Sequence, residues 1–310
     1  MNSELIPELL SQHYGLKNPH YELIRSLTNY VYRVNTATER FILKIFSDTW
    51  RHYEDVQYEI ALLEHLSNKG LRVANALPTK NGDKIVRLSR DSEDCYMVLF
   101  EYVAGVKPQP SFSNELYASF GKAIAQTHEF SNDFNAPVHR QPLDLEYLIE
   151  RPLALTAPLL PHAADRQFVD DVAQKTKAKI SHLAARGMDW GPIHGDATLD
   201  NLHITTDNQI ILYDFDSGGP GWRATDLQGW AKNRPEYADK WLAFQAGYKS
   251  IRDLKAVDLE AAPYLATAFI LWGFQNALGS RVSQQGPAKV QAYLAVALHD
   301  LRERASYILG

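Results

Sequence analysis

The sequence of 310 residues predicts an α+β protein of two lobes, an N-terminal lobe built on an antiparallel sheet and a mainly helical C-terminal lobe. Two observations support this fold class. Short β-rich runs with turn residues between them occupy most of the chain up to residue 101, and segments with helical spacing of apolar residues dominate from residue 113 onward. We place the boundary just after the last β-rich run, which gives residues 1–103 for the first lobe and residues 104–310 for the second.

In the N-terminal lobe an amphipathic helix is expected first, ended by Gly15. Three β-rich runs follow, and turn residues such as Thr28 and Asn29 connect them, which favours antiparallel pairing. A helix with leucines at helical spacing and two further strands complete the lobe. The expected ranges are residues 4–14 (helix), 21–27, 31–37 and 40–46 (strands), 50–68 (helix), and 84–88 and 96–101 (strands).

Helices make up most of the C-terminal lobe. They are predicted over residues 113–130, 143–149, 165–186, 235–248, 259–278 and 287–308, and another begins near residue 224. Ser113 is expected to cap the first of them, and His128 near its end is expected to pack or cap rather than to catalyse. The helix over 259–278 is apolar nearly all round, so it should be buried. Residues 131–161, rich in Pro, Asn and Asp, either line a substrate site or cross the surface.

The composition bounds the class of protein. A hydrophobic content of 45% allows a large core, and Cys95, the single cysteine, excludes an internal disulfide and suits a reducing, cytoplasmic location. The first ten residues lack the pattern of a signal peptide, and no run of about 18 apolar residues indicates a membrane span. A net charge of −5 without a cluster of Arg and Lys argues against a nucleic-acid partner. The same charge is compatible with a cationic substrate.

Residues 193–216, IHGDATLDNLHITTDNQIILYDFD, gather groups that suit metal and proton chemistry. Two short β-type runs, 202–205 and 209–213, flank a turn-forming cluster and predict a tight hairpin. The ends of a hairpin lie side by side, so Asn201 before the first strand is expected near Asp214 after the second.

Mg²⁺ prefers oxygen ligands in octahedral geometry and keeps several waters. One carboxylate, one amide oxygen and the phosphates of a nucleotide therefore make a suitable set of ligands. Asp196 stands five residues before Asn201 on the same loop. Such an acid can accept a hydroxyl proton, or orient the hydroxyl, for attack on a phosphate that the metal holds.

At these residues the chain resembles the aminoglycoside phosphotransferase and choline kinase superfamily, small-molecule kinases built on the protein-kinase fold. The catalytic loop of that family reads roughly HGDxxxxN and its metal segment reads DFD, and residues 194–201 and 214–216 supply both in the same order. An HGD turn or a DFD triplet alone is usually only a turn or a strand end, but the combination is specific. Thr198 stands where many members have a second histidine. This difference weakens the assignment to a subfamily more than it weakens the assigned reaction.

The resemblance implies a two-lobed protein-kinase-like fold with ATP and Mg²⁺ between the lobes. It implies transfer of the γ-phosphoryl group of ATP to a hydroxyl of a small molecule. Asp196 is then the catalytic residue that orients and deprotonates this hydroxyl, Asn201 and Asp214 hold Mg²⁺, and Asp216 contacts a second metal ion. Asp226 is expected to be a buried acid that braces the catalytic loop.

Lys44 lies in an expected strand, FILKIF, between apolar neighbours. Its ammonium group either reaches solvent from an edge or is held by an anion in a cleft. In the resembled enzymes the lysine of the third strand contacts the α- and β-phosphates, and a glutamate on the next helix orients it. Glu59 matches this glutamate by order and distance, although Glu54, Asp55 and Glu64 on the same helix are alternatives.

The strand that runs through MVLFEYVAG, residues 97–105, resembles the hinge between kinase lobes, where backbone groups bind adenine. Glu101 and Val103 are the candidate nucleotide-binding residues there. The connection over residues 26–30 has no glycine and fits a phosphate-binding loop and an ordinary hairpin equally well. Nothing in these residues separates ATP from GTP.

The phosphate acceptor stays open. Four tryptophans and two acids could furnish a site for an amine or a quaternary ammonium group, although core packing explains most of the tryptophans equally well. They are Trp222, Trp230, Trp241, Trp272, Asp258 and Glu260. Homoserine, choline-like amino alcohols, aminoglycosides and sugars all remain candidates, with an amino alcohol or related metabolite weakly favoured over an antibiotic.

Three other functions remain as alternatives. A Ser/Thr protein kinase of the bacterial stress-response type is one, because residues 145–155, LEYLIERPLAL, look like part of it. A catalytically silent nucleotide-binding module is another, against which the intact Asp196, Asn201 and Asp214 argue. A metal-dependent hydrolase would need more clustered His or Asp ligands than this sequence offers. The oligomeric state does not follow from the sequence.

Overall fold

The structure is a computed structural model, and it describes residues 3–26, 28–48, 50–90, 93–109, 112–227, 234–278, 282 and 285–309. The chain divides into two compact units. Unit 1 comprises Met1–Gly105, Asn135–Arg140 and Ile211–Tyr213, and unit 2 comprises Val106–Phe134, Gln141–Ile210 and Asp214–Gly310. Two short segments thus belong to unit 1 although the chain on both sides of each belongs to unit 2.

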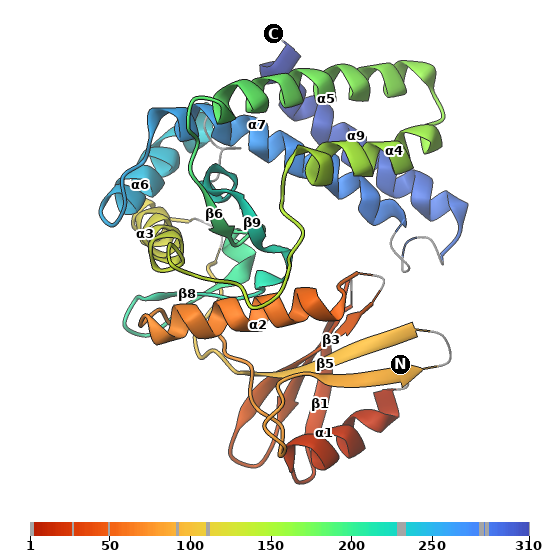
Figure 1. Ribbon diagram of the computed structural model, residues 1–310, viewed down its shortest axis with the longest axis vertical. Coiled ribbons are helices and arrows are strands. Elements are labelled where there is room, and N and C mark those ends of the chain that lie inside the picture. The colour runs from red at the N-terminus through yellow and green to blue at the C-terminus, as the bar shows by residue number, and fades with distance from the viewer. Residues whose placement is uncertain are drawn as a thin grey trace. The chain divides into compact units, whose positions relative to one another are not determined.

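Unit 1 is built on a five-stranded antiparallel sheet with the order β1-β2-β3-β5-β4 (Figure 1). The strands are β1 (His20–Ser26), β2 (Tyr30–Asn35), β3 (Arg40–Ser47), β4 (Val86–Arg90) and β5 (Glu93–Glu101), and the helices are η1 (Ser3–Leu5), α1 (Ile6–Tyr14) and α2 (Tyr53–Asn68). These are the strands and helices that the sequence predicts, with ends that differ by a few residues. The chain before α2 is extended at His52, so this helix begins later than predicted.

The two faces of the sheet carry different side chains because successive residues of a strand point to opposite sides. On one face, Leu43 and Ile45 of β3 belong to a buried cluster with Ile6 and Leu10 of α1. Lys44 points to the other face, towards α2. The alternation of β3 therefore places one buried lysine opposite a helix.

Unit 2 is mainly helical. Its helices are α3 (Asn114–Phe130), the π-helix η2 (Glu146–Glu150), α4 (Arg151–Thr156), η3 (Ala157–Leu159), α5 (Ala163–Ala184), η8 (Pro235–Tyr237), α6 (Ala238–Lys249), α7 (Ala256–Gly273), η9 (Phe274–Leu278) and α9 (Pro287–Leu309). Ser113 caps α3 as predicted, since its Oγ accepts the N–H of Leu116 at 3.2 Å. Helix α7 is buried as predicted and packs against α5 and α9 (Figure 1). No helix among the described residues is long and apolar enough to cross a membrane.

Short strands and turns carry the expected catalytic stretch, and all of them lie in unit 2 except Ile211 and Leu212 of β8, which belong to unit 1. β6 (Trp190–Ile193) pairs with β9 (Gly219–Trp222), and β7 (Leu202–Ile204) with β8 (Ile210–Leu212), which confirms the predicted hairpin. Three 3₁₀ turns lie beside these strands: η4 (Leu199–Asn201), η5 (Phe215–Ser217) and η6 (Arg223–Leu227). The helix predicted to begin near residue 224 is therefore a 3₁₀ turn up to Leu227, and residues 228–233 lie outside the described part.

Helices α3 and α6 approach each other closely at two glycines. A Cβ atom on Gly121 would lie 2.0 Å from the carbonyl oxygen of Phe244, and one on Gly247 would lie 1.8 Å from that of Ala118. The rings of Phe120 and Phe244 pack edge to face beside this contact, 5.5 Å apart. Small residues at this seam let the two backbones touch, which fixes the distance between the helices.

We expect Gly247→Ala to lower the free energy of unfolding by about 2 kcal/mol, because the new methyl group forces α3 and α6 apart. Urea unfolding followed by circular dichroism measures the effect. Gly273→Ala is the matched control, since a Cβ atom there meets nothing within 4 Å and alanine favours a helix. Equal stability of the Gly247 variant and the wild type would contradict the close packing.

Candidate active site

The loop after β6 turns sharply at Gly195. The φ angle of Gly195 is +80°, and a Cβ atom there would lie 2.3 Å from the carbonyl oxygen of Ser217. Both the left-handed backbone and the close approach require glycine. The N–H of Asp196 donates to Nδ1 of His194 at 3.3 Å, so the proton of a neutral His194 ring is on Nε2. The HGD sequence thus forms a tight turn that presents the Asp196 side chain.

Asp196 and Asn201, two of the predicted site residues, are in direct contact. Nδ2 of Asn201 donates to Oδ2 of Asp196 at 2.8 Å and to the carbonyl oxygen of Asp196 at 2.9 Å. Because both bonds use the amide nitrogen, the amide oxygen of Asn201 points away from the Asp196 carboxylate. That oxygen is the atom that a hard cation prefers.

Asp214 and Asp216 follow β8 within and beside a 3₁₀ turn. Asp214 has φ 67° and ψ 57°, a left-handed conformation that costs roughly 1–2 kcal/mol for a residue with a side chain. Asp216 is buried, and its Oδ1 accepts the hydroxyl of Ser217 at 3.3 Å. Between them, the ring of Phe215 stacks against His194 with centroids 4.3 Å apart. The strained turn and this stack tie the DFD segment to the catalytic loop.

Burial raises the pKa of Asp196 above its usual range, and the negative charges of Asp214 and Asp216 raise it further. The charge of His194 and the hydrogen bond from Asn201 act in the opposite direction. The three carboxylates therefore act on one another electrostatically. A carboxyl group with a raised pKa is a stronger base, which suits proton transfer from a hydroxyl.

The donor set fits a magnesium ion that is shared with a nucleotide. Among the described residues, no three His, Cys, Asp or Glu side chains are grouped so that they could hold a metal ion by themselves. Asn201, Asp214 and Asp216 offer amide and carboxylate oxygens, and phosphates and water supply the remaining ligands that Mg²⁺ needs. These oxygens therefore suit a cation whose other ligands come from a nucleotide and water.

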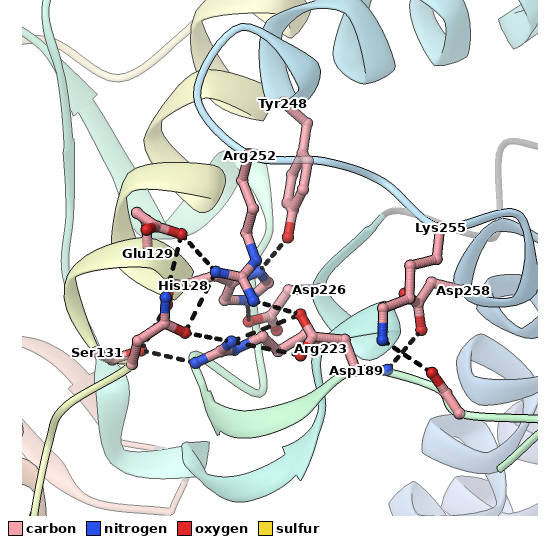
Figure 2. Close-up of polar contacts among 12 residues, drawn as sticks. His128, Glu129, Ser131, Asp189, Arg223, Asp226, Tyr248, Arg252, Lys255 and Asp258 are labelled. Atoms are coloured by element: carbon pink, nitrogen blue, oxygen red, sulfur yellow. Dashed lines mark hydrogen bonds and ion pairs between the residues drawn. The ribbon is translucent and has the colours of Figure 1, made fainter. Parts of the chain in front are cut away.

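A buried acid holds the catalytic loop by its backbone, as the resemblance implied. Asp226, which is 1% exposed, accepts the N–H of His194 at 2.7 Å and that of Gly195 at 3.0 Å. Its Oδ2 also accepts Nε2–H of His128 at 3.0 Å, and Nδ1 of His128 lies 2.8 Å from the hydroxyl of Tyr248 (Figure 2). His128 thus packs, as predicted, and links α3 and α6 to the loop.

Burial and hydrogen bonding determine the charges of Asp226 and His128. Burial alone would raise the pKa of Asp226, but the hydrogen bonds from His128 and from the His194 backbone hold it below its usual range. Burial lowers the pKa of His128, against the effect of Asp226. At neutral pH Asp226 is therefore charged and His128 neutral. With its proton on Nε2, His128 accepts the hydroxyl of Tyr248.

A second cluster fixes the other end of the β6–β9 ribbon (Figure 2). Asp189 lies just before β6, and its carboxylate accepts a hydrogen bond from Nη2 of Arg252 at 2.8 Å. The same carboxylate lies 3.5 Å from Nη1 of Arg223, which follows β9. Burial favours the neutral form of Asp189, but the two arginines hold its pKa below the usual range. The N–H of Asp189 donates to Oδ1 of Asp258 at 2.9 Å. Sequence reasoning missed this cluster because its members share no local pattern.

The acids considered for an amine site are engaged inside the protein. Asp258 is buried against the Asp189 backbone, and Glu260 pairs with Lys179 and Arg186. Of the four tryptophans, Trp241 and Trp272 are buried, and Trp222 packs edge to face on Trp190, 5.1 Å away. Trp230 lies outside the described residues. Packing and internal ion pairs therefore account for Asp258, Glu260 and the three described tryptophans.

In unit 1, Lys44 and Glu59 form a buried pair. Nζ of Lys44 lies 3.6 Å from Oε1 of Glu59, and the residues are 5% and 4% exposed. This burial excludes the alternative of a solvated strand lysine. Other acids of α2 are placed elsewhere: Asp55 pairs with Arg140 and Glu64 with Lys84. Glu59 is therefore the residue of α2 that approaches Lys44.

At the end of β5, Glu101 makes two hydrogen bonds to the backbone of Asn75. The N–H of Glu101 donates to the carbonyl oxygen of Asn75 at 2.9 Å, and its Oε2 accepts the Asn75 N–H at 3.2 Å. N–H and C=O of one strand residue point the same way, so the Glu101 carbonyl faces the edge away from β3. Val103 follows in a segment without regular structure. The adenine contact at Glu101 and Val103 stays a prediction.

Comparisons with known proteins identify relatives. The model of a family described as the phosphotransferase enzyme family matches residues 20–258. An uncharacterized protein of Deinococcus radiodurans is 33% identical over 286 residues, which cover 90% of this chain and 82% of that protein. A homoserine kinase of Sinorhizobium medicae is 25% identical over 284 residues, which cover 89% of this chain and 83% of that protein. The predicted resemblance is confirmed.

Solved structures share the fold. A microcompartment-associated aminopropanol kinase has a TM-score of 0.79 and 22% identity, covering 99% of this chain and 98% of that one. An amicoumacin kinase in complex with AMP-PNP, Ca²⁺ and Ami has a TM-score of 0.78 and 17% identity, covering 98% of this chain and 94% of that one. The predicted fold class, an antiparallel-sheet part and a mainly helical part of protein-kinase-like type, is confirmed.

Proposed function

Because the chain belongs to the phosphotransferase enzyme family, we propose that it transfers the γ-phosphoryl group of ATP, with Mg²⁺, to a hydroxyl of a small molecule. The observation that carries this proposal is the contact between Asn201 and Asp196. It joins a metal-binding amide to the acid that receives the proton. An amicoumacin kinase that shares the fold has been solved with AMP-PNP and Ca²⁺, which supports a nucleoside triphosphate with a divalent cation.

The residues of unit 2 carry the chemistry in this proposal. Asp196 orients the acceptor hydroxyl and takes its proton at the carboxylate, helped by its raised pKa. Asn201 and Asp214 hold Mg²⁺, which neutralises phosphate charge when it is bound, and Asp216 contacts a second ion. Asp226 keeps the loop in place through the backbone of residues 194 and 195. Such enzymes work mainly by positioning groups and neutralising charge.

The residues of unit 1 hold the nucleotide in this proposal. Lys44, oriented by Glu59, contacts the α- and β-phosphates, and backbone groups of Glu101 and Val103 bind adenine. We accordingly assign nucleotide binding to residues 1–103 and catalysis with acceptor binding to residues 104–310. The buried pair of Lys44 and Glu59 supports this assignment, because a buried ammonium group is expensive unless an anion lies beside it.

An amino alcohol is the acceptor class that we propose. A homoserine kinase is a relative at the sequence level, and an aminopropanol kinase shares the fold. Both names describe acceptors with a hydroxyl and an amine. The amicoumacin kinase among the structural relatives favours an antibiotic as the second candidate.

Incubation of the protein with labelled ATP, Mg²⁺ and a panel of acceptors tests the proposal. The panel contains homoserine, aminopropanol, choline, an aminoglycoside and a sugar, with a protein extract run in parallel. We expect label on an amino alcohol, and none with the Asp196→Asn variant. Label on proteins of the extract alone would make the chain a protein kinase. No transfer to any acceptor, with ATP still bound, would leave a nucleotide-binding module.

We expect Lys44→Met to raise the dissociation constant of MgATP by about tenfold or more and that of adenosine by less than about twofold. Methionine keeps the apolar stem but removes the ammonium group. Adenosine has no phosphates for that group to contact, so its binding should change little. Isothermal titration calorimetry measures both constants. An equal loss for both ligands would indicate a damaged unit 1 instead of a missing phosphate contact.

A further inference from the structure

We propose that Arg140 is a positioning residue for the nucleotide phosphates: it fixes α2 through Asp55, and α2 in turn holds Glu59 against Lys44. The inference rests on the proposed function, since it takes Lys44 as the phosphate contact. Arg140 ends the segment Asn135–Arg140, which belongs to unit 1 although Phe134 and Gln141 on either side belong to unit 2. The last residue of this six-residue segment thus contacts α2, the helix that carries Glu59.

The contact is a buried ion pair. Nη1 of Arg140 lies 2.6 Å from Oδ1 of Asp55, and the side chains are 5% and 19% exposed. A charge is costly to bury, and a buried pair adds little net stability compared with apolar residues. It is, however, short and directional, so it fixes where its two partners sit. The side chains of the Arg33–Glu22 pair in the same unit are 43% and 67% exposed, so this pair lacks the constraint.

Asp55 transmits this constraint to the start of α2. Its Oδ1 binds Arg140, and its Oδ2 accepts the backbone N–H of His52, the residue that caps the helix, at 3.1 Å. Residues four apart lie on the same face of a helix, so Glu59 stands one turn beyond Asp55 on the face that Arg140 grips. A shift of the first turn therefore moves Glu59 with it.

The start of α2 has a second anchor on the side of the sheet. Asp48, just after β3, accepts the hydroxyl of Tyr96 at 2.6 Å and lies 3.2 Å from Nδ1 of His52. The ring of Tyr53, the first residue of α2, packs on Tyr96 and Arg87 on the same side. Without Arg140 the first turn keeps these contacts to the sheet and loses the ion pair at Asp55. The distance of 3.6 Å between Lys44 and Glu59 is already long for a hydrogen bond, so a small displacement of α2 weakens it. Lys44 then loses the group that aims its ammonium.

A double-mutant cycle separates positioning from general stabilisation. Arg140→Met, Lys44→Met and the double variant are titrated with MgATP and with adenosine. We expect Arg140→Met to weaken MgATP binding by about five- to tenfold and adenosine binding by less than about twofold. In the Lys44→Met background the Arg140 substitution should cause no further loss, because the residue through which it acts is gone. Arg140→Lys, which keeps a charge for Asp55, should restore most of the affinity.

Arg33→Met, which removes the exposed pair with Glu22, is the matched control and should leave both affinities unchanged. If the losses in MgATP affinity add in the double variant, or if Arg140→Met weakens adenosine binding equally, the inference about Arg140 is wrong while the proposed function stands. Unchanged MgATP binding in Lys44→Met would overturn the phosphate role of Lys44 and this inference with it. If Arg140→Met does not fold, Asp55→Asn takes its place, because it removes the charge and keeps an acceptor for His52.

Discussion

Replacing Asp196 with Asn should reduce turnover by about three orders of magnitude while leaving MgATP affinity within about twofold of the wild type. The amide oxygen of the new residue can still accept the hydrogen bond from Asn201, so the loop keeps its geometry. What disappears is a carboxylate whose raised pKa makes it able to take a proton. The substitution therefore separates proton transfer from metal and nucleotide binding.

Single-turnover phosphoryl transfer to the acceptor found in the panel measures this effect, and calorimetry measures MgATP binding in parallel. Asp200→Asn is the matched control, since Asp200 is an exposed acid in the next turn, η4. Its turnover should stay near that of the wild type. An Asp196 variant with near wild-type turnover would show that another group receives the proton.

Asp226→Asn should be the most damaging substitution for stability, with a loss of about 3 kcal/mol in the free energy of unfolding. Asp226 accepts three N–H donors, from His128, His194 and Gly195. An asparagine has one acceptor oxygen, and its amide nitrogen would face at least one of these donors inside the protein. Turnover should fall as well, because the catalytic loop loses its anchor.

Urea unfolding at several pH values tests this prediction. The folded-state pKa of Asp226 lies below the ordinary value of 3.8, so its charge contributes stability that is present above that value. This stability is lost as the pH falls through the lowered folded-state pKa. The Asn variant should therefore lose less stability than the wild type on acidification. Asp253→Asn, at an exposed position, is the control; an equal pH dependence of Asp226→Asn and wild type would contradict a charged, buried Asp226.

The sequence predicts those features that depend on neighbours along the chain. The alternation in β3, the spacing in α2 and the turn residues of the hairpin place Lys44, Glu59 and Asn201 on the right elements, because local pattern determines each of them. The family motifs add the proposed roles of Asp196 and Asp214. The choice of Glu59 over Asp55 needed the structure, since it depends on which acid another part of the chain already binds.

The features that the sequence does not predict are contacts between distant, individually ordinary residues. Arg223, Asp189 and Arg252 meet in one cluster, yet they lie far apart in the sequence. The acids considered for an amine site, Asp258 and Glu260, are engaged for the same reason. Tertiary packing decides which charges are buried and paired, and no periodicity along the chain records it.

The anchor at Asp226 also determines which substitutions the catalytic loop can tolerate. Asp226 binds the backbone N–H groups of residues 194 and 195, which every amino acid except proline supplies. This anchor therefore does not depend on the side chains at 194 and 195, whereas the ring of His194 and the amide of Asn201 make the side-chain contacts of the loop. Glycine at 195 is the exception because of its conformation. Asp226 thus holds the backbone beside Asp196 in place whatever the side chains at 194 and 195 contribute.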